Sequence, residues 1–243
     1  MKKILVFGGG GFLGSHVCDK LSEKGFNVTI FDLKASKYIK KNQNMYIGDI
    51  LNKNDVNNAV EKAEIVYNFA GLSDIDESRM NPISTVKSNI LGNTYILNAC
   101  KNSNIERFIF ASSVYVYSNK GSFYRASKQA CENYIEVFNE LYNLSYTILR
   151  YGSLYGPRAD MRNGIYRFIH DAINTDKMTF KGFPESAREF IHVEDAANCS
   201  IKILNNKYVN KHIILTGQNR IRIDELLTMI KEMLPNKNIE INY

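Results

Sequence analysis

The chain has 243 residues, of which 44% are hydrophobic and 23% charged, and its formal net charge at pH 7 is +6. This composition is typical of a globular protein with one good core, and no apolar stretch approaches the ~18 residues that a membrane helix needs. The basic residues are scattered among Asp, Glu and Asn, which favours a solvated basic surface over a nucleic-acid-binding patch.

The chain begins with a strand, a glycine turn and a helix, a pattern that indicates a dinucleotide site. Gly8 allows the tight turn, Gly11 lets the backbone approach a pyrophosphate, and Gly14 lets the helix lie close to the sheet. The helix begins near Phe12 and would direct its free N–H groups and positive dipole end at the phosphates. A flexible glycine loop is the alternative, and the flanking strand and helix argue against it.

An acidic residue closes the next strand. Asp32 lies eighteen residues after Gly14, where a carboxylate can accept hydrogen bonds from both adenine-ribose hydroxyls. A 2′-phosphate would meet its negative charge, so the sequence predicts NAD as the cofactor rather than NADP. The basic residues of 34–41 follow this strand and are expected to form a loop near the adenosine end.

Strands and helices alternate as far as Arg150. Strands are expected at 45–47, 64–69, 107–111 and 145–150, with helices at 55–62, from Pro82 to about residue 100, and at 124–142. The last of these helices has an apolar stripe at Ala130, Tyr134, Val137, Phe138 and Leu141. Continuous apolar strands between amphipathic helices predict an α/β fold, a Rossmann-type doubly wound parallel sheet covered on both faces.

The regular alternation stops after Arg150. Helices are expected near 164–174, 193–205 and 223–233, with a strand at 212–215, among turn-rich segments. We therefore predict an NAD-binding Rossmann domain at 1–150 and a small C-terminal substrate-binding lobe at 151–243, with segments of the lobe packed back on the Rossmann core. No linker-like tract separates the two.

Tyr124 and Lys128 lie four residues apart, hence on one face of a helix. An ammonium near a phenol lowers a pKa that starts near ~10, so Tyr124 is a candidate general base, and Lys128 could also hold the nicotinamide-ribose hydroxyls. A chain this rich in Tyr and Lys is expected to contain such a pair by chance, so its position carries the argument. Ser112 and Ser113 directly follow the preceding strand, where a hydroxyl can hold the reacting oxygen. A solvent-exposed ion pair is the alternative.

Together these stretches resemble an extended short-chain dehydrogenase/reductase of the NAD-dependent epimerase/dehydratase family, whose members act mainly on nucleotide sugars. The matching stretches are Gly8-x-x-Gly11-Phe12-Leu13-Gly14, Gly48-Asp49-Ile50, Asn68-Phe69-Ala70-Gly71, Asn89-x-x-Gly92, Ala111-Ser112-Ser113, Tyr124-Arg-Ala-Ser-Lys128, Leu149-Arg150-Tyr151, Tyr155-Gly156-Pro157-Arg158 and Arg188-Glu-Phe-Ile-His-Val-Glu-Asp195. They occur in family order over residues 1 to about 230.

The resemblance implies a catalytic set and two groups of binding residues. The catalytic set is Ser113, Tyr124 and Lys128. The cofactor contacts include the glycines, Asp32 and Lys128. The resemblance adds Phe12, Leu13, Asp49, Ile50, Phe69, Ala70 and Gly71, with Asp49 and Ile50 beside the adenine. The substrate contacts are Ser112, Ser113, Tyr124, Ser153, Arg158 and Arg188, with Arg188 on the sugar nucleotide's diphosphate. A salt bridge of Arg188 with Glu189 or Asp195 is an equal alternative, and Asn89 is expected to buttress the backbone.

No metal site is expected. The four cysteines (Cys18, Cys100, Cys131 and Cys199) are widely spaced without a C-x-x-C, and His192-x-Glu194-Asp195 matches no metal motif and reads as a helix start. With no signal-peptide pattern, we expect a reducing, cytoplasmic compartment.

Three departures from the family pattern bear on the reaction. Val114 and Tyr115 occupy the positions where dehydratases carry an Asp-Glu pair, which argues against 4,6-dehydratase activity. Tyr124 comes only eleven positions after Ser113, so a loop that normally covers the sugar is short. Ser153 stands where many members have a substrate-binding asparagine.

The sequence thus predicts NAD-dependent oxidation of a secondary hydroxyl, at C4 of a nucleotide-diphosphate sugar. The short loop favours a 4-dehydrogenase, with a 4-epimerase as the first alternative and a keto-sugar reductase as the second. A dinucleotide-sensing or RNA-binding scaffold is the non-enzyme alternative. The expected partners are a nucleotide-sugar substrate and a second copy of the chain, bound through the helices near 83–102 and 124–142, with no nucleic acid and no membrane.

Overall fold

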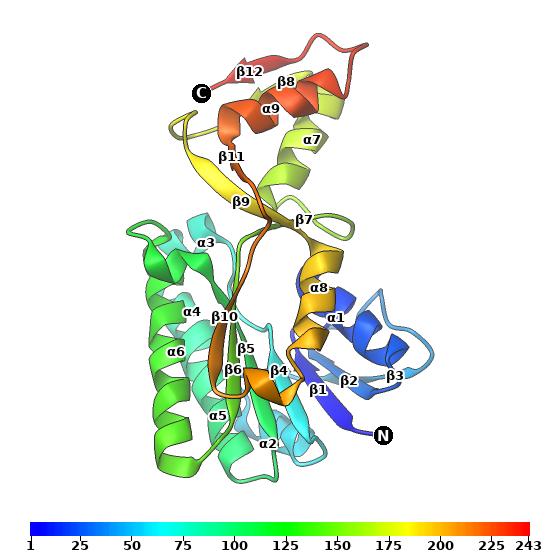
Figure 1. Ribbon diagram of the computed structural model, residues 1–243, viewed down its shortest axis with the longest axis vertical. Helices are drawn as coiled ribbons and strands as arrows, with labels where there is room; N and C mark the ends of the chain where they lie inside the picture. Colours follow the sequence, from blue (N-terminus) through cyan, green and yellow to red (C-terminus); the bar gives the residue numbers. More distant parts are fainter. The chain divides into compact units, whose positions relative to one another are not determined.

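The computed structural model describes residues 1–243, which form two compact units (Figure 1). The first unit comprises Met1–Tyr151 together with Ala197–Ile214, and the second comprises Gly152–Ala196 together with Leu215–Tyr243. The segment Ala197–Ile214, which lies between two parts of the second unit along the chain, therefore belongs to the first unit.

The first unit is built on a seven-stranded sheet. Its strands are β1 (Lys3–Phe7), β2 (Asn27–Asp32), β3 (Gln43–Ile47), β4 (Ile65–Asn68), β5 (Arg107–Ser113), β6 (Tyr146–Tyr151) and β10 (Lys211–Leu215), in the spatial order β10-β6-β5-β4-β1-β2-β3. All the pairings from β3 through β6 are parallel. The order reverses between β1 and β4, which is the point where doubly wound sheets bind dinucleotides. The predicted Rossmann-type fold is confirmed.

Helices cover both faces of this sheet (Figure 1). They are α1 (Phe12–Glu23), α2 (Lys53–Val60), α3 (Ile75–Met80), α4 (Pro82–Thr85), the π-helical segment η1 (Val86–Leu91), α5 (Gly92–Lys101), the 3-10 turn η2 (Val114–Tyr117), α6 (Ser122–Tyr142), α8 (Val193–Lys202) and the 3-10 turn η3 (Asn206–Tyr208). Buried side chains of α2, α5 and α6 pack with those of the strands in one core cluster, represented by Val56, Ile96, Ile135 and Phe108. None of the helices combines the length and apolarity needed to cross a bilayer.

The end of α8 and the residue after it are fastened to the sheet by buried polar groups. The Tyr67 hydroxyl donates to the Ser200 carbonyl at 2.7 Å, and the Tyr151 and Ser200 hydroxyls share a hydrogen bond of 2.6 Å. Arg107 donates to the Ile203 carbonyl at 2.9 Å. These bonds give a physical reason for the return of residues 197–214 to the first unit, because buried hydroxyls need partners.

Helix α6 turns a different face to the sheet than its apolar stripe predicts. The buried residues are Ser127, Lys128, Cys131, Glu132 and Ile135. Of the predicted stripe, Tyr134 and Val137 are each 47% exposed and Leu141 is 61% exposed. The inward face is therefore mixed, with Ser127, Lys128 and Glu132 beside the apolar Ile135. Of the predicted stripe, Phe138 packs against the core, whereas Tyr134, Val137 and Leu141 are exposed.

The helical stretch that follows Pro82 is interrupted. Where one continuous helix was predicted, the structure has α4, the π-helical η1 and α5. Such π-helical turns are rare and often occur at functional sites. This one contains Asn89, which is buried.

The second unit is a small α/β module. Its strands are β7 (Ser153–Tyr155), β8 (Lys177–Thr179), β9 (Ala187–His192), β11 (Arg220–Arg222) and β12 (Glu240–Asn242), and its helices are α7 (Gly164–Thr175) and α9 (Ile223–Glu232), with the first residues of α8. The strands form a three-stranded sheet, β11-β9-β7, and a two-stranded one, β12-β8. Phe168 and Ala172 of α7 pack with Leu227 and Ile230 of α9 in its core.

Candidate active site

Two glycines of the turn after β1 leave no room for a side chain. Gly8 has φ +71°, and a Cβ there would lie 2.7 Å from the Ala70 nitrogen in the loop after β4. A Cβ on Gly14 would lie 2.2 Å from the Gly8 carbonyl oxygen. Helix α1 is thus seated directly against the turn, and the turn against the neighbouring strand end, as the glycine pattern predicts.

The N-terminus of α1 is open to an anion. Gly11 caps the helix without a side-chain hydrogen bond, and no acidic residue lies in the first turn. A Cβ on Gly11 would have only the Gly8 carbonyl oxygen, at 3.2 Å, within 4 Å. The free N–H groups and positive dipole end of the helix therefore face open space, which fits the pyrophosphate of a dinucleotide.

Asp32 is held at this turn by backbone groups. Its Oδ2 accepts from the Gly10 N–H at 3.0 Å and its Oδ1 from the Leu33 N–H at 2.8 Å. Each carboxylate oxygen can still accept a further hydrogen bond. The Asp32 side chain is thus fixed beside the glycine turn, in an orientation that leaves each oxygen able to accept from a ribose hydroxyl.

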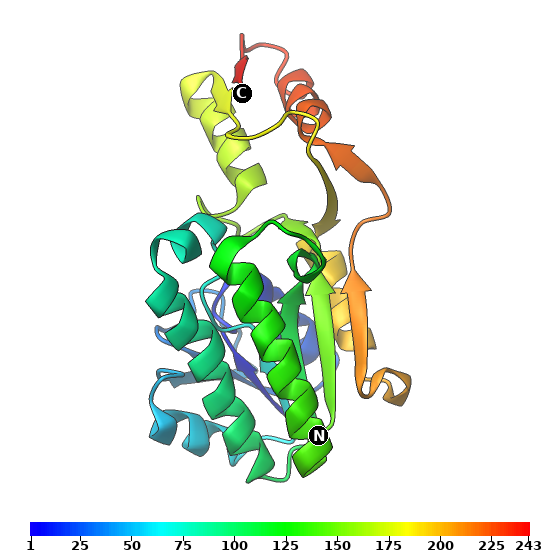
Figure 2. The ribbon, with the colours of Figure 1, turned by 90° about the vertical axis from the view of Figure 1, so that its left-hand side faces the viewer.

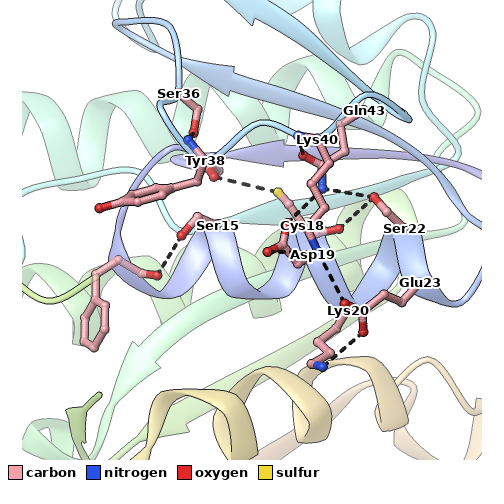
Figure 3. A network of polar contacts seen from close by, with 12 residues as sticks. Ser15, Cys18, Asp19, Lys20, Ser22, Glu23, Ser36, Tyr38, Lys40 and Gln43 are labelled. Atoms are coloured by element: carbon pink, nitrogen blue, oxygen red, sulfur yellow. Dashed lines mark hydrogen bonds and ion pairs between the residues drawn. The ribbon is translucent and has the colours of Figure 1, made fainter. Parts of the chain in front are cut away.

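The loop that follows Asp32 is fastened to α1 (Figure 3). Gln43 donates from Nε2 to Asp19 Oδ1 and to Ser22 Oγ, both at 3.1 Å, and its Oε1 accepts from the Lys40 N–H at 2.9 Å. Lys40 Nζ lies 3.3 Å from Asp19 Oδ2 and 3.4 Å from Glu23 Oε1. These contacts close the basic loop onto the far side of the glycine helix.

Two further loops, at the ends of β3 and β4, lie next to the cofactor cradle, which is formed by β1, the glycine turn, α1 and β2. After β3, the Gly48 N–H donates to the Asp32 carbonyl at 3.0 Å, which places Asp49 beside the end of β2. Ile50 lies against α5, because a Cβ on Gly92 would come 2.7 Å from Ile50 Cδ1. After β4, the Phe69 N–H donates to the Phe7 carbonyl at 2.9 Å.

Asn89 shapes the loop after β4. Its Oδ1 accepts from the Leu72 N–H at 2.7 Å, and its Nδ2 donates to the Leu72 carbonyl at 3.0 Å and to Ser127 Oγ at 2.8 Å. A Cβ on Gly71, which has φ +137°, would lie 2.6 Å from Asn89 Oδ1. The expectation that Asn89 buttresses the backbone is confirmed, and Gly71 is needed for the close approach.

Ser113, Tyr124 and Lys128 come together where β5 ends and α6 begins. Ser113 is the last residue of β5 and shares a side-chain hydrogen bond with Tyr124. Lys128 lies one turn further along α6, with Nζ 5.6 Å from the centroid of the Tyr124 ring. Ser113 and Lys128 are both buried, and Tyr124 keeps part of its surface exposed although its hydroxyl group is buried.

The predicted lowering of the Tyr124 pKa is wrong for the protein without ligands. Burial raises the pKa of Tyr124 to about 12, while its hydrogen bond with Ser113 acts in the opposite direction. The Lys128 ammonium donates instead to the Ala111 carbonyl at 2.7 Å and lies 4.7 Å from the centroid of the Phe110 ring. Burial lowers the pKa of Lys128.

Ser112 is directed to a different partner than the substrate. It is buried, and its hydroxyl donates to Oε1 of Glu132. Glu132 also accepts from Nε of Arg150 at 3.0 Å. Sequence reasoning overlooked Glu132. The available signal was a carboxylate four residues after Lys128, on the same face of α6 as Tyr124.

The segment between Ser113 and α6 carries no acid. Val114 and Tyr115 lie in η2, and the Tyr115 ring meets the Tyr124 ring edge to face, with centroids 6.5 Å apart. Gly121, with φ +100°, is packed closely against the Tyr115 ring. A tight turn thus links η2 to α6, and an aromatic ring stands beside Tyr124 where a dehydratase has its glutamate.

The remaining predicted substrate residues lie in the second unit. Ser153 of β7 is paired with Phe190 of β9, and Arg188 of β9 is paired with Ile221 of β11. Arg188 donates to the Ala187 carbonyl at 3.1 Å and forms no ion pair with Glu189 or Asp195.

Two other predictions also concern the second unit. Arg158 has φ +68°, in the turn that follows Gly156. Helix α8 begins at Val193, which confirms that the His192–Asp195 motif is a helix start, and the structure groups no three His, Cys, Asp or Glu side chains into a candidate metal site.

Comparison with known proteins agrees with this geometry. The model of the NAD dependent epimerase/dehydratase family matches residues 4–217. A protein of Methanocaldococcus jannaschii named provisionally as a UDP-glucose 4-epimerase is 32% identical, over 94% of this chain and 81% of its own. The UDP-N-acetyl-alpha-D-glucosaminuronate decarboxylase of Bacillus cytotoxicus is 31% identical, over 89% of this chain and 75% of its own.

A solved structure extends the likeness to the cofactor. The UDP-glucose 4-epimerase of Thermus thermophilus in complex with NAD aligns with a TM-score of 0.89 at 25% identity, over 99% of this chain and 85% of that one. The open helix N-terminus, the glycines without room for a Cβ and the fixed Asp32 carboxylate suit the same cofactor. The chain therefore belongs to the NAD-dependent epimerase/dehydratase family, and it is an NAD-dependent enzyme of the extended short-chain dehydrogenase/reductase type, among enzymes that modify nucleotide sugars.

Proposed function

We propose that the enzyme interconverts the C4 epimers of a nucleotide-diphosphate sugar, with UDP-glucose as the first substrate to test. The observation that carries this proposal is the cluster of Ser113, Tyr124 and Lys128 at the end of β5, beside a position where Tyr115 replaces an acid. That set can remove and return the proton of one secondary hydroxyl but has no further carboxylate for elimination of water. The names of the Methanocaldococcus jannaschii protein and of the Thermus thermophilus structure favour epimerisation over the dehydrogenase expected from the short loop.

The residues divide the work between proton transfer and positioning. Tyr124 takes the proton of the C4 hydroxyl in the first half-reaction and returns a proton to the C4 oxygen in the second. Ser113 holds that oxygen by a hydrogen bond. NAD, when bound, supplies the reversible acceptor for the hydride of C4. For the other epimer to form, the keto sugar would have to present its opposite face before Tyr124 returns the proton.

The raised pKa of Tyr124 determines the protonation state in which the phenol begins the reaction. With a pKa of about 12 the Tyr124 phenol is protonated at pH 7, which is the form that returns a proton. The Ser113 hydrogen bond lowers the pKa of Tyr124, so this serine also assists formation of the phenolate. We therefore expect the rate of C4 oxidation to rise with pH through the neutral range.

Replacement of the Tyr124 hydroxyl tests the proposal. Tyr124→Phe keeps the ring against Tyr115 and removes only the acid/base group, so turnover should fall by about 10²- to 10⁴-fold while NAD binding is retained. Tyr134→Phe is the matched control, since this tyrosine lies on the exposed side of the same helix, and its turnover should equal that of the wild type. Unchanged turnover in Tyr124→Phe would overturn the proposed role.

A dehydrogenase is the second candidate function. It is favoured by the tight turn before α6, since a short covering loop retains a keto intermediate less well. Release of a keto sugar, two mass units lighter than the substrate, would identify it. A keto-sugar reductase would run that reaction in the opposite direction.

We also propose that the enzyme is a homodimer. The outer faces of α4, η1 and α6 carry apolar side chains: Ile83 is 70% exposed, Val86 53%, Val137 47% and Leu141 61%. These helices contact one another on one face of the sheet (Figure 2). An apolar face on two adjacent helices suits a self-complementary four-helix contact with a second copy around a two-fold axis.

The mass in solution tests the dimer. Leu141→Glu places a charge in this face and should convert a dimer into a monomer at micromolar concentration, measured by light scattering. Met229→Glu is the control, because Met229 is 50% exposed on α9 of the other unit. A wild-type chain of monomeric mass would contradict the proposal.

A further inference from the structure

An ion pair between a buried glutamate and a partly buried arginine lies behind the catalytic serine. The Glu132 side chain is 7% exposed and that of Arg150 14% exposed. Arg150 meets both carboxylate oxygens, with Nε 3.0 Å from Oε1 and Nη2 2.5 Å from Oε2. Such a two-pronged contact fixes the orientation of both side chains as well as their distance.

The pair holds the chain on both sides of Ser113. On one side, the Ser112 hydroxyl donates to Oε1 of Glu132. On the other, Arg150 Nη1 donates to the Tyr117 hydroxyl, and its guanidinium lies 4.7 Å from the centroid of the Tyr117 ring. The residue before Ser113 and the last residue of η2 are thus bound to the same ion pair.

The pair also ties this segment to the catalytic helix. Tyr124, Lys128 and Glu132 succeed one another at intervals of four residues along α6, so they lie on one face. Arg150 belongs to β6, next to the β5 strand that ends at Ser113. A shift of α6 along its axis would therefore be opposed by contacts to two strands and to η2.

At the edge of the sheet, His212 and Glu136 extend the contacts of the Arg150 guanidinium. His212 of β10 has Nδ1 2.7 Å from Arg150 Nη2, and its Nε2 lies 2.9 Å from Oε1 of Glu136. Glu136 is half-exposed and contacts neither Ser112 nor Arg150. It thus belongs to the same helix and the same network without touching the residues on either side of Ser113.

We infer that the Glu132–Arg150 ion pair is a positioning device that fixes Ser113 relative to Tyr124 by holding Ser112 and Tyr117. Its consequence for turnover rests on the proposed function, but its effect on the segment Ser112–Tyr117 does not. Loss of the pair should loosen this segment locally while the cofactor cradle, which is built from β1, α1 and β2, keeps its structure. The affinity for NAD and the catalytic rate should therefore respond differently.

Three variants release the segment to different degrees. Ser112→Ala and Tyr117→Phe each remove one contact without leaving a buried charge unpaired. Glu132→Gln removes the ion pair itself and leaves the guanidinium uncompensated, so its folding is checked first by its thermal midpoint. Glu136→Gln is the control, because the Glu136 side chain contacts His212 directly but touches neither Ser112 nor Arg150.

Hydrogen exchange followed by mass spectrometry reports on the segment without any assay of activity. In Ser112→Ala and Tyr117→Phe, peptides covering 112–118 should exchange roughly tenfold faster, as expected for loss of one hydrogen bond, with peptides of the glycine turn unchanged. Glu132→Gln should show a larger increase in the same peptides. The inference is overturned if exchange at 112–118 is unchanged in all three variants, or if Glu136→Gln increases it equally.

Turnover provides the second readout. If the wild type converts a nucleotide sugar, the two single-contact variants should lower kcat by about 10- to 100-fold with the Kd for NAD within about twofold of wild type, since small misplacements of reacting groups have effects of this size. A rise in the Kd for NAD with kcat unchanged would refute the positioning role. If the wild type converts no nucleotide sugar, the proposed function fails, and hydrogen exchange still decides the role of the pair.

Discussion

The closest packing in the cofactor cradle occurs at Gly14, and one methyl group there should damage both folding and NAD binding. In Gly14→Ala the new Cβ would lie 2.2 Å from the Gly8 carbonyl oxygen, 2.9 Å from Gly9 Cα and 3.0 Å from the Gly8 carbonyl carbon. All three atoms belong to the backbone, so no side-chain rotation can relieve the contact. Real Cβ atoms essentially never come within 3.0 Å of such an atom, so α1 and the turn must move apart.

The expected losses of stability and of NAD affinity both follow from that separation. Overpacking of this kind destabilises by about 1–3 kcal/mol, and we expect the upper part of the range because only backbone can move. The displaced helix N-terminus also moves away from the pyrophosphate. A loss of about 1.4 kcal/mol of binding free energy corresponds to a tenfold rise in Kd, so the Kd for NAD should rise at least tenfold.

Urea denaturation and calorimetric titration with NAD measure the two effects separately. Gly164→Ala is the matched control, because a Cβ at this first residue of α7 meets no atom within 4 Å. It should leave the Kd for NAD unchanged and alter stability by no more than about 1 kcal/mol, in the stabilising direction. If Gly14→Ala unfolds at the wild-type urea concentration and binds NAD with wild-type affinity, the reasoning about the cradle is refuted.

Three further predictions concern the cofactor, the catalytic lysine and stability at high pH. Asp32→Ala should weaken NAD binding by about 10- to 100-fold, as for hydrogen bonds to a charged group, and should narrow the ratio of NADP to NAD dissociation constants in a titration with each. Lys128→Met removes the ammonium beside the Tyr124 ring and should lower kcat at least tenfold in the epimerase assay, whereas Lys120→Met, on the exposed turn before α6, should leave it unchanged. Burial raises the pKa of Tyr67 and of Tyr151, so in the unfolded chain these phenols ionise near ~10 while in the folded protein they stay protonated. The free energy of unfolding should thus be unaffected by these phenols below pH ~10 and should fall above it, by up to about 1.4 kcal/mol per pH unit for each phenol. In urea titrations at several pH values, Tyr67→Phe should show a smaller fall than the wild type. An equal dependence on pH in the variant would contradict this assignment.

The cofactor cradle could be predicted from the sequence because local geometry determines it. The requirement for glycine at residue 14 arises from backbone contacts within the strand-turn-helix unit, and at residue 8 it arises from a φ of +71° together with the loop after β4. The fixed spacing to Asp32 follows from the strand that pairs with β1. Continuous apolar strands likewise indicate a buried parallel sheet in whatever order the strands pair.

The faces of α6 could not be assigned in the same way. Hydrophobic periodicity identifies the apolar face of a helix but does not say whether that face meets the sheet or another molecule. Here the buried face of α6 contains Lys128, Cys131 and Glu132, whose polar groups form hydrogen bonds with neighbouring elements. Those partners come from β5, β6 and η1, and only the tertiary structure brings them together.

Tertiary contacts also explain the errors at single residues. The expected effect of Lys128 on the phenol assumed that the ammonium points at Tyr124, but the Ala111 carbonyl competes for it. Ser112 and Ser113 are adjacent and chemically identical, and only the position of Glu132 explains why Ser112 bonds that carboxylate whereas Ser113 interacts with Tyr124.

Analysis of the sugar product tests the central claim most directly. The purified enzyme is incubated with NAD and a panel of UDP-, GDP- and dTDP-sugars, with Tyr124→Phe in parallel, and the sugars are separated by chromatography and weighed by mass spectrometry. The account predicts that one substrate yields a second sugar of unchanged mass and different retention, and that the variant forms none. A product two mass units lighter would show that the keto sugar is released and that the enzyme is a dehydrogenase, and equal conversion by the Tyr124→Phe variant would contradict the assigned chemistry altogether.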